Sequence, residues 1–568
     1  MHQTAVRKVL ETAARGKALF FWAIPLVFLL FFFFYPLGSV FGLAGKAAFT
    51  QDISVNVWTR IWRPFAFTLW QATLSMVLTL LIGLPAAYLF ARFQFNGKEI
   101  LRTLTTLPFI LPTVVVAVSF SALIGPRGWL NILLMRWFNL SSPPIEILNT
   151  LFAILLAHVF YNVSVVIRTV GSAWSQLDPR TEQAARVLGA SPIRVLREVT
   201  LPLLKKPIAA AALLVFLFDF TSFGVILLLG GPRFATLEVE IYIQALQMLN
   251  LPLSGLLSAI QMLCTLILLV IYTRITSGEN IPLMPRLKGE GERAPQKIGE
   301  RIFVATMIVI LVVLQFLPLG ALVLRSVTTL EANRGQRGVV ETGLTLDYYR
   351  ELFINRRESL FYVPPIEAMG NSLYYASITV VLSIGMGFLV AYALKTRSRI
   401  NRVFDSLLML PLGTSAVTLG LGFIVAFNRP PIDVRSFPLL MPVAHSLVAL
   451  PFVVRTLQPA LASIPDSLRH AAAVMGAAPW RVWLEVDLPI LARAVVVGAV
   501  FSFTISLGEF GATTFLSRPE MPTMPVAIFR FISQPGALNY GQAMAMSTLL
   551  MMVCAAGILL MDNFRSDL

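Results

Sequence analysis

Two carboxylates stand inside long apolar segments of this sequence. Asp219 lies within Val215-Phe-Leu-Phe-Asp-Phe-Thr-Ser-Phe-Gly224, and Glu509 lies within Ser506-Leu-Gly-Glu-Phe-Gly511. An ionised carboxylate at membrane depth is costly, so it normally faces a cavity or a partner. The pair therefore predicts a polar path that suits a positively charged cargo. The alternative is that each carboxylate caps a neighbouring helix or pairs with a structural arginine.

The two segments correspond to each other when the chain is shifted by 287 residues. Under this shift Ser222 stands where Glu509 does, and the two carboxylates lie three residues apart in register. Residues three apart lie about one turn apart on a helix. We therefore expect Asp219, Ser222, Ser506 and Glu509 to line a translocation path.

Two histidines also occupy equivalent positions, His158 in the first half and His445 in the second. A hydrogen bond to a neighbouring helix is the favoured role for both, and a metal-ligand role is the alternative. The only two cysteines, Cys264 and Cys554, stand in apolar stretches. We expect neither a metal site nor a disulfide framework.

No pattern of catalytic groups accompanies these residues. The sequence contains no G-x-x-x-x-G-K-[ST] motif, so the chain cannot cradle ATP phosphates in the usual way. It also shows no Ser/His/Asp set with convincing spacing. We expect no catalytic residue, and an integral membrane enzyme is a weaker alternative than a transporter.

Composition excludes a water-soluble globule. Of 568 residues, 57% are hydrophobic and only 13% are charged, with a mean hydropathy of +0.77. Soluble domains carry roughly a quarter charged residues. The net charge of +16 does not indicate nucleic acid, because the basic residues lie in short loops between apolar runs. The basic start, Met1 to Lys17, leads into an apolar run too long for a signal peptide, so we expect a retained first helix.

The apolar runs predict an all-α polytopic membrane protein with about twelve spans. A bilayer core needs roughly 20 apolar residues in a helix, and runs of this length exclude barrel strands. The predicted spans are 18–44, 66–91, 105–124, 150–170, 207–230, 255–273, 302–325, 371–394, 404–427, 437–456, 491–515 and 542–561.

Lys and Arg in the loops predict the orientation. They gather around 92–102, 180–206, 274–301 and 395–402, which places these loops and both termini in the cytoplasm. The loop 326–370 also carries arginines, but its length makes it a weak guide.

A polar segment interrupts the apolar runs once in each half. Gln183-Ala-Ala-Arg-Val-Leu-Gly-Ala-Ser-Pro-Ile-Arg-Val-Leu-Arg-Glu-Val-Thr-Leu-Pro202 matches His470-Ala-Ala-Ala-Val-Met-Gly-Ala-Ala-Pro-Trp-Arg-Val-Trp-Leu-Glu-Val-Asp-Leu-Pro489 at the same shift of 287. We call these segments the islands. A plain connecting loop is the alternative for one copy, but two copies at matched positions favour a docking element.

Each island predicts a helix, a turn and a second short helix. Gly189 permits a turn that a Cβ would hinder, and Pro192 suits the first turn of the following helix. Arg194 and Glu198 are spaced to pair on one helix face. The residues that repeat this pattern in the second island are Ala471, Ala472, Gly476, Pro479, Arg481 and Glu485.

The repeat divides the chain into residues 1–273, a linker at 274–301 rich in Gly, Pro and charge, and residues 302–568. The linker predicts a flexible tether. Six spans per half, with both ends on the same side, make the halves parallel repeats related by an axis along the membrane normal.

The islands resemble the signature loop of membrane subunits of ABC importers, in which Glu-Ala-Ala is followed by Gly and then by an apolar-x-Leu-Pro end. Gln183 and His470 stand where the signature usually has Glu. The resemblance implies the type I permease fold and an ATPase-docking role for the islands. The residues concerned are Gln183, Ala184, Ala185, Gly189, Arg194, Glu198, His470, Ala471, Ala472, Gly476, Arg481 and Glu485.

A fused two-copy chain resembles the ferric iron and thiamine permease group, and Leu155–Asn162 and Ser222–Gly231 resemble thiamine permeases. This implies a bacterial inner-membrane subunit that binds no cofactor itself, with ATP and Mg²⁺ on two copies of an ATPase and cargo delivered by an extracytoplasmic binding protein. Leu344 to Phe353 resembles an external helix of such permeases, a rim contact for that binding protein. An ion-coupled secondary transporter is the main alternative.

Overall fold

The computed structural model describes residues 21–50, 55–231, 233–276, 291–329, 343–354, 363–395, 399–429, 432–433 and 437–565. Helices dominate these residues, and the only sheets among them are two short antiparallel pairs, β1 (Thr328–Thr329) with β2 (Gly343–Leu344) and β3 (Asn428–Arg429) with β4 (Ile432–Asp433). The expected all-α polytopic class is confirmed.

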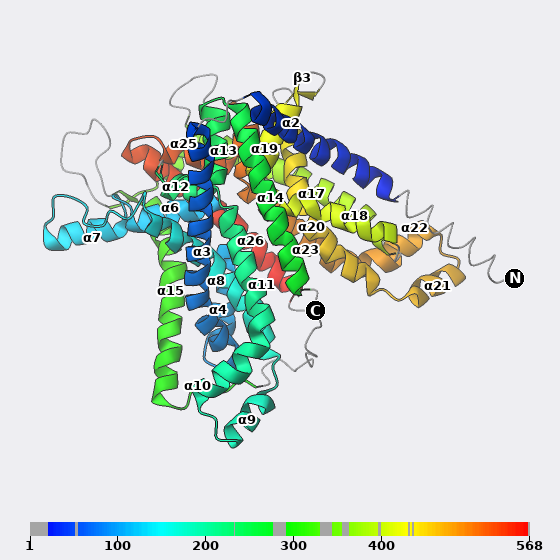
Figure 1. Cartoon of the computed structure of the whole chain (residues 1–568), viewed down its shortest axis with the longest axis horizontal. Coiled ribbons are helices and arrows are strands. Elements are labelled where there is room, and N and C mark those ends of the chain that lie inside the picture. Colours follow the sequence, from blue (N-terminus) through cyan, green and yellow to red (C-terminus); the bar gives the residue numbers. More distant parts are fainter. Residues whose placement is uncertain are drawn as a thin grey trace.

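The first half is a bundle of long helices joined by short ones (Figure 1). In chain order its elements are η1 (Leu30–Phe34), α2 (Tyr35–Thr50), α3 (Val55–Arg92), α4 (Lys98–Leu104), α5 (Leu107–Ile110), α6 (Thr113–Ile124), α7 (Trp129–Phe138), α8 (Leu151–Ser175), α9 (Pro179–Val187), α10 (Pro192–Val195), η2 (Leu196–Thr200), α11 (Leu201–Phe220), α12 (Gly224–Leu229), α13 (Leu237–Tyr242), η3 (Ile243–Gln247) and α14 (Leu251–Thr276).

The second half repeats this order with a different external part. Its helices are α15 (Ile298–Ser326), α16 (Asp347–Arg350), η4 (Glu351–Phe353), α17 (Pro365–Leu394), α18 (Arg399–Met409), η5 (Leu410–Gly413), α19 (Ala416–Ala426), α20 (Leu440–Ala462), α21 (Asp466–Val474), α22 (Pro479–Val482), η6 (Trp483–Asp487), α23 (Leu488–Gly508), α24 (Gly511–Leu516), α25 (Met524–Ile532) and α26 (Ala537–Arg565).

Eleven helices of the described part are long and apolar enough to cross a membrane, and a bent pair makes up to twelve. This agrees with the predicted number. The bent pair joins Asn401–Gly413 to Ala416–Ala426 at 98°, so the predicted straight span 404–427 is wrong. Thr414 and Ser415 take extended backbone there, and the Ser415 side chain caps α19 by accepting from the Thr418 N–H at 3.2 Å.

Three other predicted spans are broken helices. Span 105–124 breaks at Pro112, because a proline has no N–H to donate and disfavours helical backbone in the residue before it. Span 207–230 is wrong as one helix, since α11 ends at Phe220 and α12 starts at Gly224. Span 491–515 likewise breaks at Glu509, whose backbone is extended. Hydropathy alone cannot detect such breaks, because the residues around them remain apolar.

The two halves share close contacts at equivalent positions. A Cβ on Gly83 would lie 2.7 Å from Val166, and a Cβ on Gly387 would lie 2.5 Å from Val453. These glycines therefore let α3 approach α8, and α17 approach α20, more closely than a larger residue could. The Leu237 N–H donates to Thr68 Oγ1 at 2.9 Å, and the Met524 N–H donates to Ser372 Oγ at 2.8 Å. The duplication therefore extends to packing and hydrogen bonding.

The first helix of each half packs against helices of the other half. Trp22, Leu29 and Phe33 pack with α17, α19 and α20, and the Trp22 indole N–H donates to Asn401 Oδ1 at 3.0 Å. In return, residues Val304, Met307 and Leu311 of α15 pack against α3 and α8. Each half therefore buries part of its apolar surface against a helix that belongs to the other half.

The described end of the linker is fastened to the first half. The Arg293 N–H donates to the Arg92 carbonyl, the Gln94 N–H donates to the Arg293 carbonyl, both at 3.0 Å, and the buried Lys98 Nζ lies 2.7 Å from Glu292 Oε2. Residues 291–293 are therefore held in place, unlike the tether expected for the whole linker. Residues 277–290 lie outside the described part.

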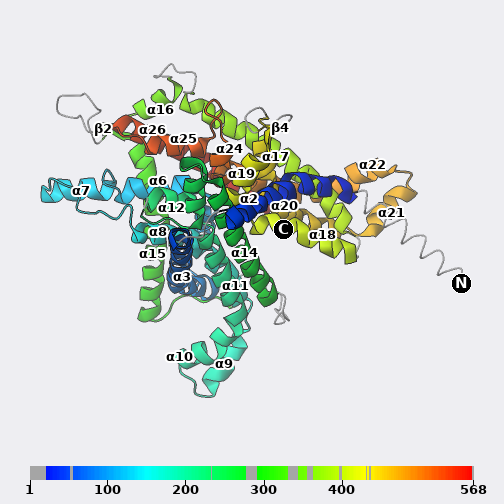
Figure 2. The same ribbon diagram turned by 45° about the horizontal axis from the view of Figure 1, so that its top comes forward.

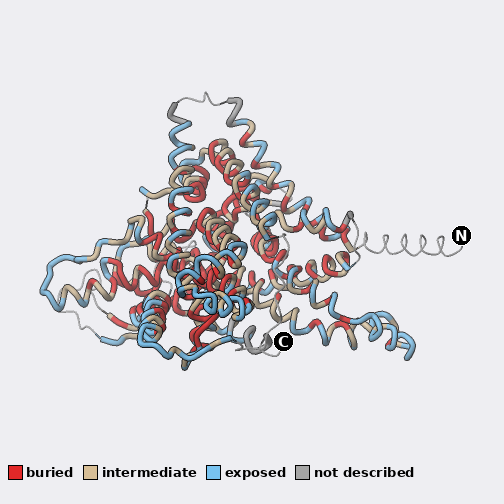
Figure 3. Tube along the Cα trace, turned by 60° about the horizontal axis from the view of Figure 1, so that its bottom comes forward, coloured by how far each residue is buried: buried red, intermediate tan, exposed pale blue. Residues whose placement is uncertain are grey.

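The islands project from the two bundles and lie far apart in both views (Figures 1 and 2). Buried segments gather where the bundles meet, whereas the projecting loops are exposed (Figure 3). The predicted external segment forms α16 and η4, and its Tyr348 ring packs directly against Gly541 of α26.

Gly387→Leu should lower the thermal stability of the detergent-purified chain, because the new side chain must displace Val453. Overpacking of this kind costs about 1–3 kcal/mol. Gly385→Leu is the matched control on the same helix, since nothing lies within 4 Å of its Cβ position. Adding Val453→Ala should restore part of the lost stability. Equal melting temperatures for the two leucine variants would contradict the close-packing account.

Candidate functional site

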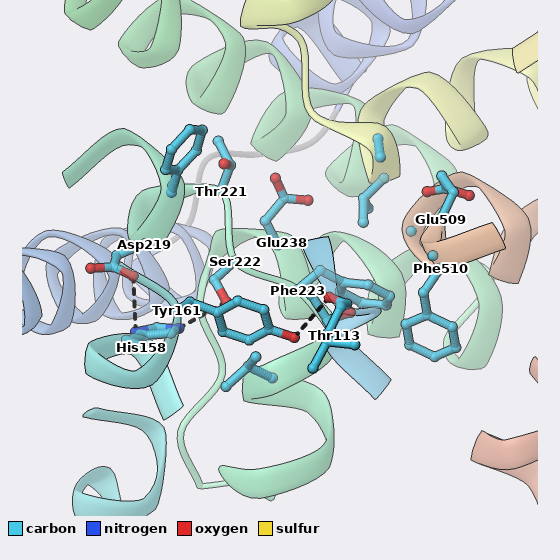
Figure 4. Close-up of a pocket in the computed structure, with 18 of the residues that line it drawn as sticks. Thr113, His158, Tyr161, Asp219, Thr221, Ser222, Phe223, Glu238, Glu509 and Phe510 are labelled. Atoms are coloured by element: carbon cyan, nitrogen blue, oxygen red, sulfur yellow. Dashed lines mark hydrogen bonds and ion pairs between the residues drawn. The ribbon is translucent and has the colours of Figure 1, made fainter. Parts of the chain in front are cut away.

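A cavity of about 320 Å³ lies between the two halves, at the breaks in α11 and α23 (Figure 4). The first half supplies most of the wall and the second half supplies the segments around Ala416 and Glu509. The polar lining residues are Thr113, His158, Tyr161, Asn162, Asp219, Thr221, Ser222, Glu238 and Glu509, and the aromatic ones are Phe109, Phe218, Phe223, Phe510 and Tyr161.

Asp219 is held by its own half. It is 1% exposed, its Oδ1 accepts from Asn162 Nδ2 at 2.7 Å, and His158 Nδ1 lies 3.4 Å from the same oxygen. Its backbone carbonyl accepts from Gln71 Nε2 at 2.7 Å, which satisfies an acceptor freed where α11 ends. Asp219 is therefore a buried, positioned carboxylate on the cavity wall.

Glu509 caps the helix that follows it. Its Oε1 accepts from the Ala512 N–H at 2.8 Å, and its Oε2 accepts from the Thr513 N–H at 2.8 Å and from Thr513 Oγ1 at 2.5 Å. An acid at a helix N-terminus is stabilised by the free N–H groups there. The alternative considered for this carboxylate, a helix cap, is thus what its geometry shows, although it also lines the cavity.

Each histidine contacts one acid and one serine, and the acid and the serine stand in opposite order in the two halves. Asp219 corresponds to Ser506, and Ser222 corresponds to Glu509. His158 Nε2 lies 2.9 Å from Ser222 Oγ, and its Nδ1 faces Asp219. His445 Nδ1 lies 2.8 Å from Ser506 Oγ, and its Nε2 lies 3.3 Å from Glu509 Oε2. Each half therefore holds one acid and one serine around one histidine.

The favoured expectation for the histidines, hydrogen bonding to a neighbouring helix, agrees with this geometry. No group of three or more His, Cys, Asp or Glu side chains that could hold a metal occurs in the ranges that the structure describes. Of the four predicted path residues, Asp219, Ser222 and Glu509 line the cavity, whereas Ser506 lies behind it against His445.

Glu238 lines the same cavity and was missed from the sequence. It lies in Thr236-Leu-Glu-Val-Glu240, outside the predicted spans, where nothing distinguishes it from other loop acids. In the structure it is 1% exposed, at the start of α13. Only the fold of the segment between α12 and α14 places it beside Asp219 and Glu509.

An aromatic pair stands where the halves meet. The rings of Phe223 and Phe510 stack with centroids 5.5 Å apart, and these residues are equivalent in the repeat. Two equivalent residues contact each other only beside the axis that relates the halves. Tyr242 packs on Phe223 and Phe529, its equivalent, packs on Phe510, each at 5.5 Å. The axis is therefore occupied by aromatic side chains in this structure.

The islands have the predicted form. Gly189 has φ +86° and Gly476 has φ +84°, which is the left-handed backbone that favours glycine. Pro192 and Pro479 begin the second short helices, and Arg194 Nε lies 2.9 Å from Glu198 Oε2. Each island then continues through a π-helical turn, η2 or η6, at equivalent residues.

Both islands expose an apolar tip. Leu188 is 88% exposed and Met475 is 81% exposed, each immediately before its turn glycine. The neighbouring exposed apolar residues are Val187 and Ile193 in the first island and Val474 and Trp480 in the second. The predicted signature residues Gln183, Ala184, His470 and Ala471 are exposed beside these tips, whereas Ala472 is buried. Exposed apolar tips of this kind mark surfaces for a partner.

Ion pairs of different composition anchor the two islands. In the first, Glu182 Oε1 accepts from Arg92 at 2.6 Å and from Thr200 Oγ1 at 3.0 Å. In the second, Arg469 stands in place of Glu182 and pairs with Asp487 at 2.8 Å, the equivalent of Thr200. The first pair therefore joins its island to α3, whereas the second pair joins α21 to the end of η6 and has a basic residue where the first has its acid.

Asp466 adds a second attachment. Hydrogen bonds from Lys395 and Arg469 to its carboxylate, both at 2.9 Å, hold the pKa of Asp466 below its ordinary value. A lowered carboxyl pKa contributes stability above the ordinary pKa, and that contribution is lost only as the pH falls through the lowered value. The attachment is therefore fully charged at neutral pH.

The comparisons with known proteins agree with this architecture. The family described as binding-protein-dependent transport system inner membrane component matches residues 79–277 and again residues 383–565, together about two thirds of the chain. The chain belongs to this family, and it carries the family's domain twice. It is thus the permease, a transport subunit of an ABC importer, and not an enzyme.

Its relatives include fused permeases of similar length. The chain is 26% identical over 529 residues to a thiamine transport system permease protein ThiP of Brucella abortus (strain 2308), covering 92% of this chain and 90% of that one. It is 26% identical over 509 residues to ThiP of Escherichia coli (strain K12), covering 86% and 88%. It is also 27% identical over 524 residues to a probable ABC transporter permease protein, y4fN, of Sinorhizobium fredii (strain NBRC 101917 / NGR234), covering 89% and 87%.

Among solved structures, a chain of a bacterial alginate ABC transporter in complex with a periplasmic protein aligns with 47% of this chain and 96% of its own length, at a TM-score of 0.40 and 18% identity.

Glu509→Ala should lower the melting temperature of the purified chain, because it leaves two backbone N–H groups of α24 without their acceptor. An unsatisfied buried polar group costs about 1–3 kcal/mol. Glu509→Gln keeps one acceptor oxygen, so its melting temperature should lie between those of the unmodified chain and of Glu509→Ala. Ser547→Ala is the control, because this buried hydroxyl has no hydrogen-bond partner among the described residues. A Glu509→Ala melting temperature equal to that of the control would rule out the capping role.

Proposed function

We propose that this permease carries thiamine or a closely similar organic cation through the cavity between its halves. The observation that supports this proposal is the lining itself, which combines the carboxylates of Asp219 and Glu238 with several aromatic rings. Carboxylates and aromatic faces both attract a cation, and the rings stack on a flat one. Thiamine carries a permanently positive thiazolium ring, and several relatives are named as thiamine permeases.

Ferric iron is the second cargo considered. A small hard metal ion would be favoured by several oxygen or nitrogen ligands converging on one point. The part of the chain that the structure describes offers no such group of three. The cavity residues favour the organic cation.

The proposed partners act on opposite faces. Two ATPase subunits, which bind ATP and Mg²⁺, dock on the apolar tips of the islands at the cytoplasmic face, where both chain termini also lie. An extracytoplasmic binding protein docks on the other face, near α16 and η4. The predicted island residues form or support the docking tips, and the pairs Arg92–Glu182 and Lys395–Asp466 transmit their movement to the bundles.

The proposed mechanism is alternating access. Closure of the ATPase pair moves the two islands, and the bundles swing about their shared interface. The stacked Phe223 and Phe510 rings separate, because they come from different halves and block the axis only while the halves are together. Asp219 and Glu238 then present negative charge to the incoming cation, and Glu509 stays bound to its own helix.

Reconstitution in proteoliposomes tests the function. With the ATPase of its own transport system, ATP inside and thiamine-loaded binding protein outside, the chain should accumulate labelled thiamine. Omission of ATP or of the ATPase should abolish accumulation. Uptake without any ATPase would favour the ion-coupled alternative, and uptake of ferric complexes in place of thiamine would overturn the proposed cargo only.

Gly189→Val and Gly476→Val should each reduce thiamine uptake by about tenfold or more while ATP hydrolysis continues. A β-branched residue is strained at positive φ, so the turn that presents the island tip must change. Gly536→Val is the matched control, because Gly536 also has a positive φ, +123°, but lies just before α26, away from both islands. Uptake should be measured together with ATPase rate. Normal uptake in both island variants, or an equal loss in the control, would contradict the coupling role.

A further inference from the structure

Glu238 connects the two halves across the cavity. Its Oε2 accepts a hydrogen bond from Ser415 Oγ at 2.6 Å, and Ser415 belongs to the second half. Its Oε1 accepts from Gln261 Nε2 of α14 at 2.7 Å, within its own half. Glu238, Gln261 and Ser415 are all buried. One oxygen of this carboxylate is thus hydrogen-bonded to its own half, and the other oxygen is hydrogen-bonded to the opposite half.

This connection occurs on one side only. Pro525 stands at the position equivalent to Glu238, and Pro112 stands before α6 where Ser415 stands before α19. A proline side chain neither donates nor accepts a hydrogen bond. The duplicated halves therefore share one such link instead of the symmetric pair that duplication would otherwise produce.

The other cavity carboxylates make no comparable link. Glu509 is bound by Ala512, Thr513 and His445 of its own half. Asp219 is bound by Asn162 and His158 of its own half. When the halves move apart, these bonds within each half can persist, but the bond between Glu238 and Ser415 cannot.

Ser415 can release the carboxylate without losing its own local role. Its oxygen accepts from the Thr418 N–H, so it remains the cap of α19 after the halves part. Glu238 has no such replacement. Gln261 still holds Oε1, which keeps the carboxylate aimed at the cavity, and Oε2 is left without a donor in a buried position. A buried charge that loses its partner is strongly destabilising until another donor or cation replaces it.

We propose that Glu238 is a state-dependent cargo residue that binds Ser415 while the halves are together and binds the positively charged ring of the cargo when they separate. The inference rests on the proposed function for the identity of the cargo. Release of Ser415 creates the acceptor, so the cation finds this site only in the open state. The same bond holds the empty permease closed, which limits ATP hydrolysis without cargo.

Two single substitutions separate the charge from the link. Glu238→Gln keeps a carbonyl oxygen that accepts from Ser415 but removes the negative charge. Ser415→Ala removes the link but keeps the charge, and Ser415→Thr retains both hydroxyl and cap and is the conservative control. Each variant is tested in the full chain, reconstituted with its ATPase and binding protein.

The two variants should fail differently. Glu238→Gln should reduce the amount of thiamine taken up per ATP hydrolysed by about tenfold, as expected for loss of a close charge pair. Ser415→Ala should raise the ATPase rate measured without binding protein severalfold, and Ser415→Thr should behave as the unmodified chain. A purely structural role would lower protein yield and all rates together.

Unchanged thiamine uptake per ATP hydrolysed in the Glu238→Gln variant would overturn the cargo role, and an unchanged basal ATPase rate in Ser415→Ala would overturn the link. The serine variants decide the link even if Glu238→Gln does not reach the membrane. If the unmodified chain takes up no thiamine, the proposed cargo fails, while the basal ATPase comparison still tests the link independently.

Discussion

Backbone groups that are freed where membrane helices break must find partners inside the protein, because lipid offers none. The cavity depends on this constraint. Its wall is made at the breaks after α11 and α23 and before α19, and the side chains that satisfy these breaks are the polar groups of the site. Glu509 and Ser415 accept from free N–H groups, and Gln71 donates to the Asp219 carbonyl. Polar residues that a helix break requires are thereby placed where a cargo can meet them.

Internal duplication explains the packing that the two halves share, whereas the polar residues of the cavity differ between them. The close glycine contacts, the hydrogen bonds to Thr68 and Ser372 and the stacked Phe223 and Phe510 follow the repeat. The histidines also follow it, but acid and serine exchange places around them. The link from Glu238 to Ser415 exists once. A path along a pseudo-symmetric axis thus has walls of unequal charge, which suits an asymmetric cargo.

The halves are joined by more than the chain between them. Each gives its first helix to the other, and residues 291–293 are fastened to the α3–α4 turn beside Arg92, which also anchors the first island. Movement of that island therefore acts on α3, on the end of the linker and, through it, on α15. The second island is joined to its bundle by Lys395, after α17, which pairs with Asp466 of α21. In both halves a basic residue at the end of a long bundle helix therefore holds a carboxylate of the short helix α9 or α21, although the positions of the pairs differ.

The sequence by itself determined the class of the protein, the number of its spans, the duplication and the islands, because each depends on local composition or on a match between distant segments. At Gly189 and Gly476 the residue type alone predicted the turn, because glycine adopts left-handed backbone without a steric penalty. Only the tertiary structure decided which polar residues meet. It showed the breaks that hydropathy cannot detect, assigned Glu509 to a cap, moved Ser506 behind the cavity and placed Glu238 on its wall. A hydropathy pattern reports how apolar a segment is, whereas the role of a buried carboxylate depends on which donors the packing of other helices brings within hydrogen-bonding distance.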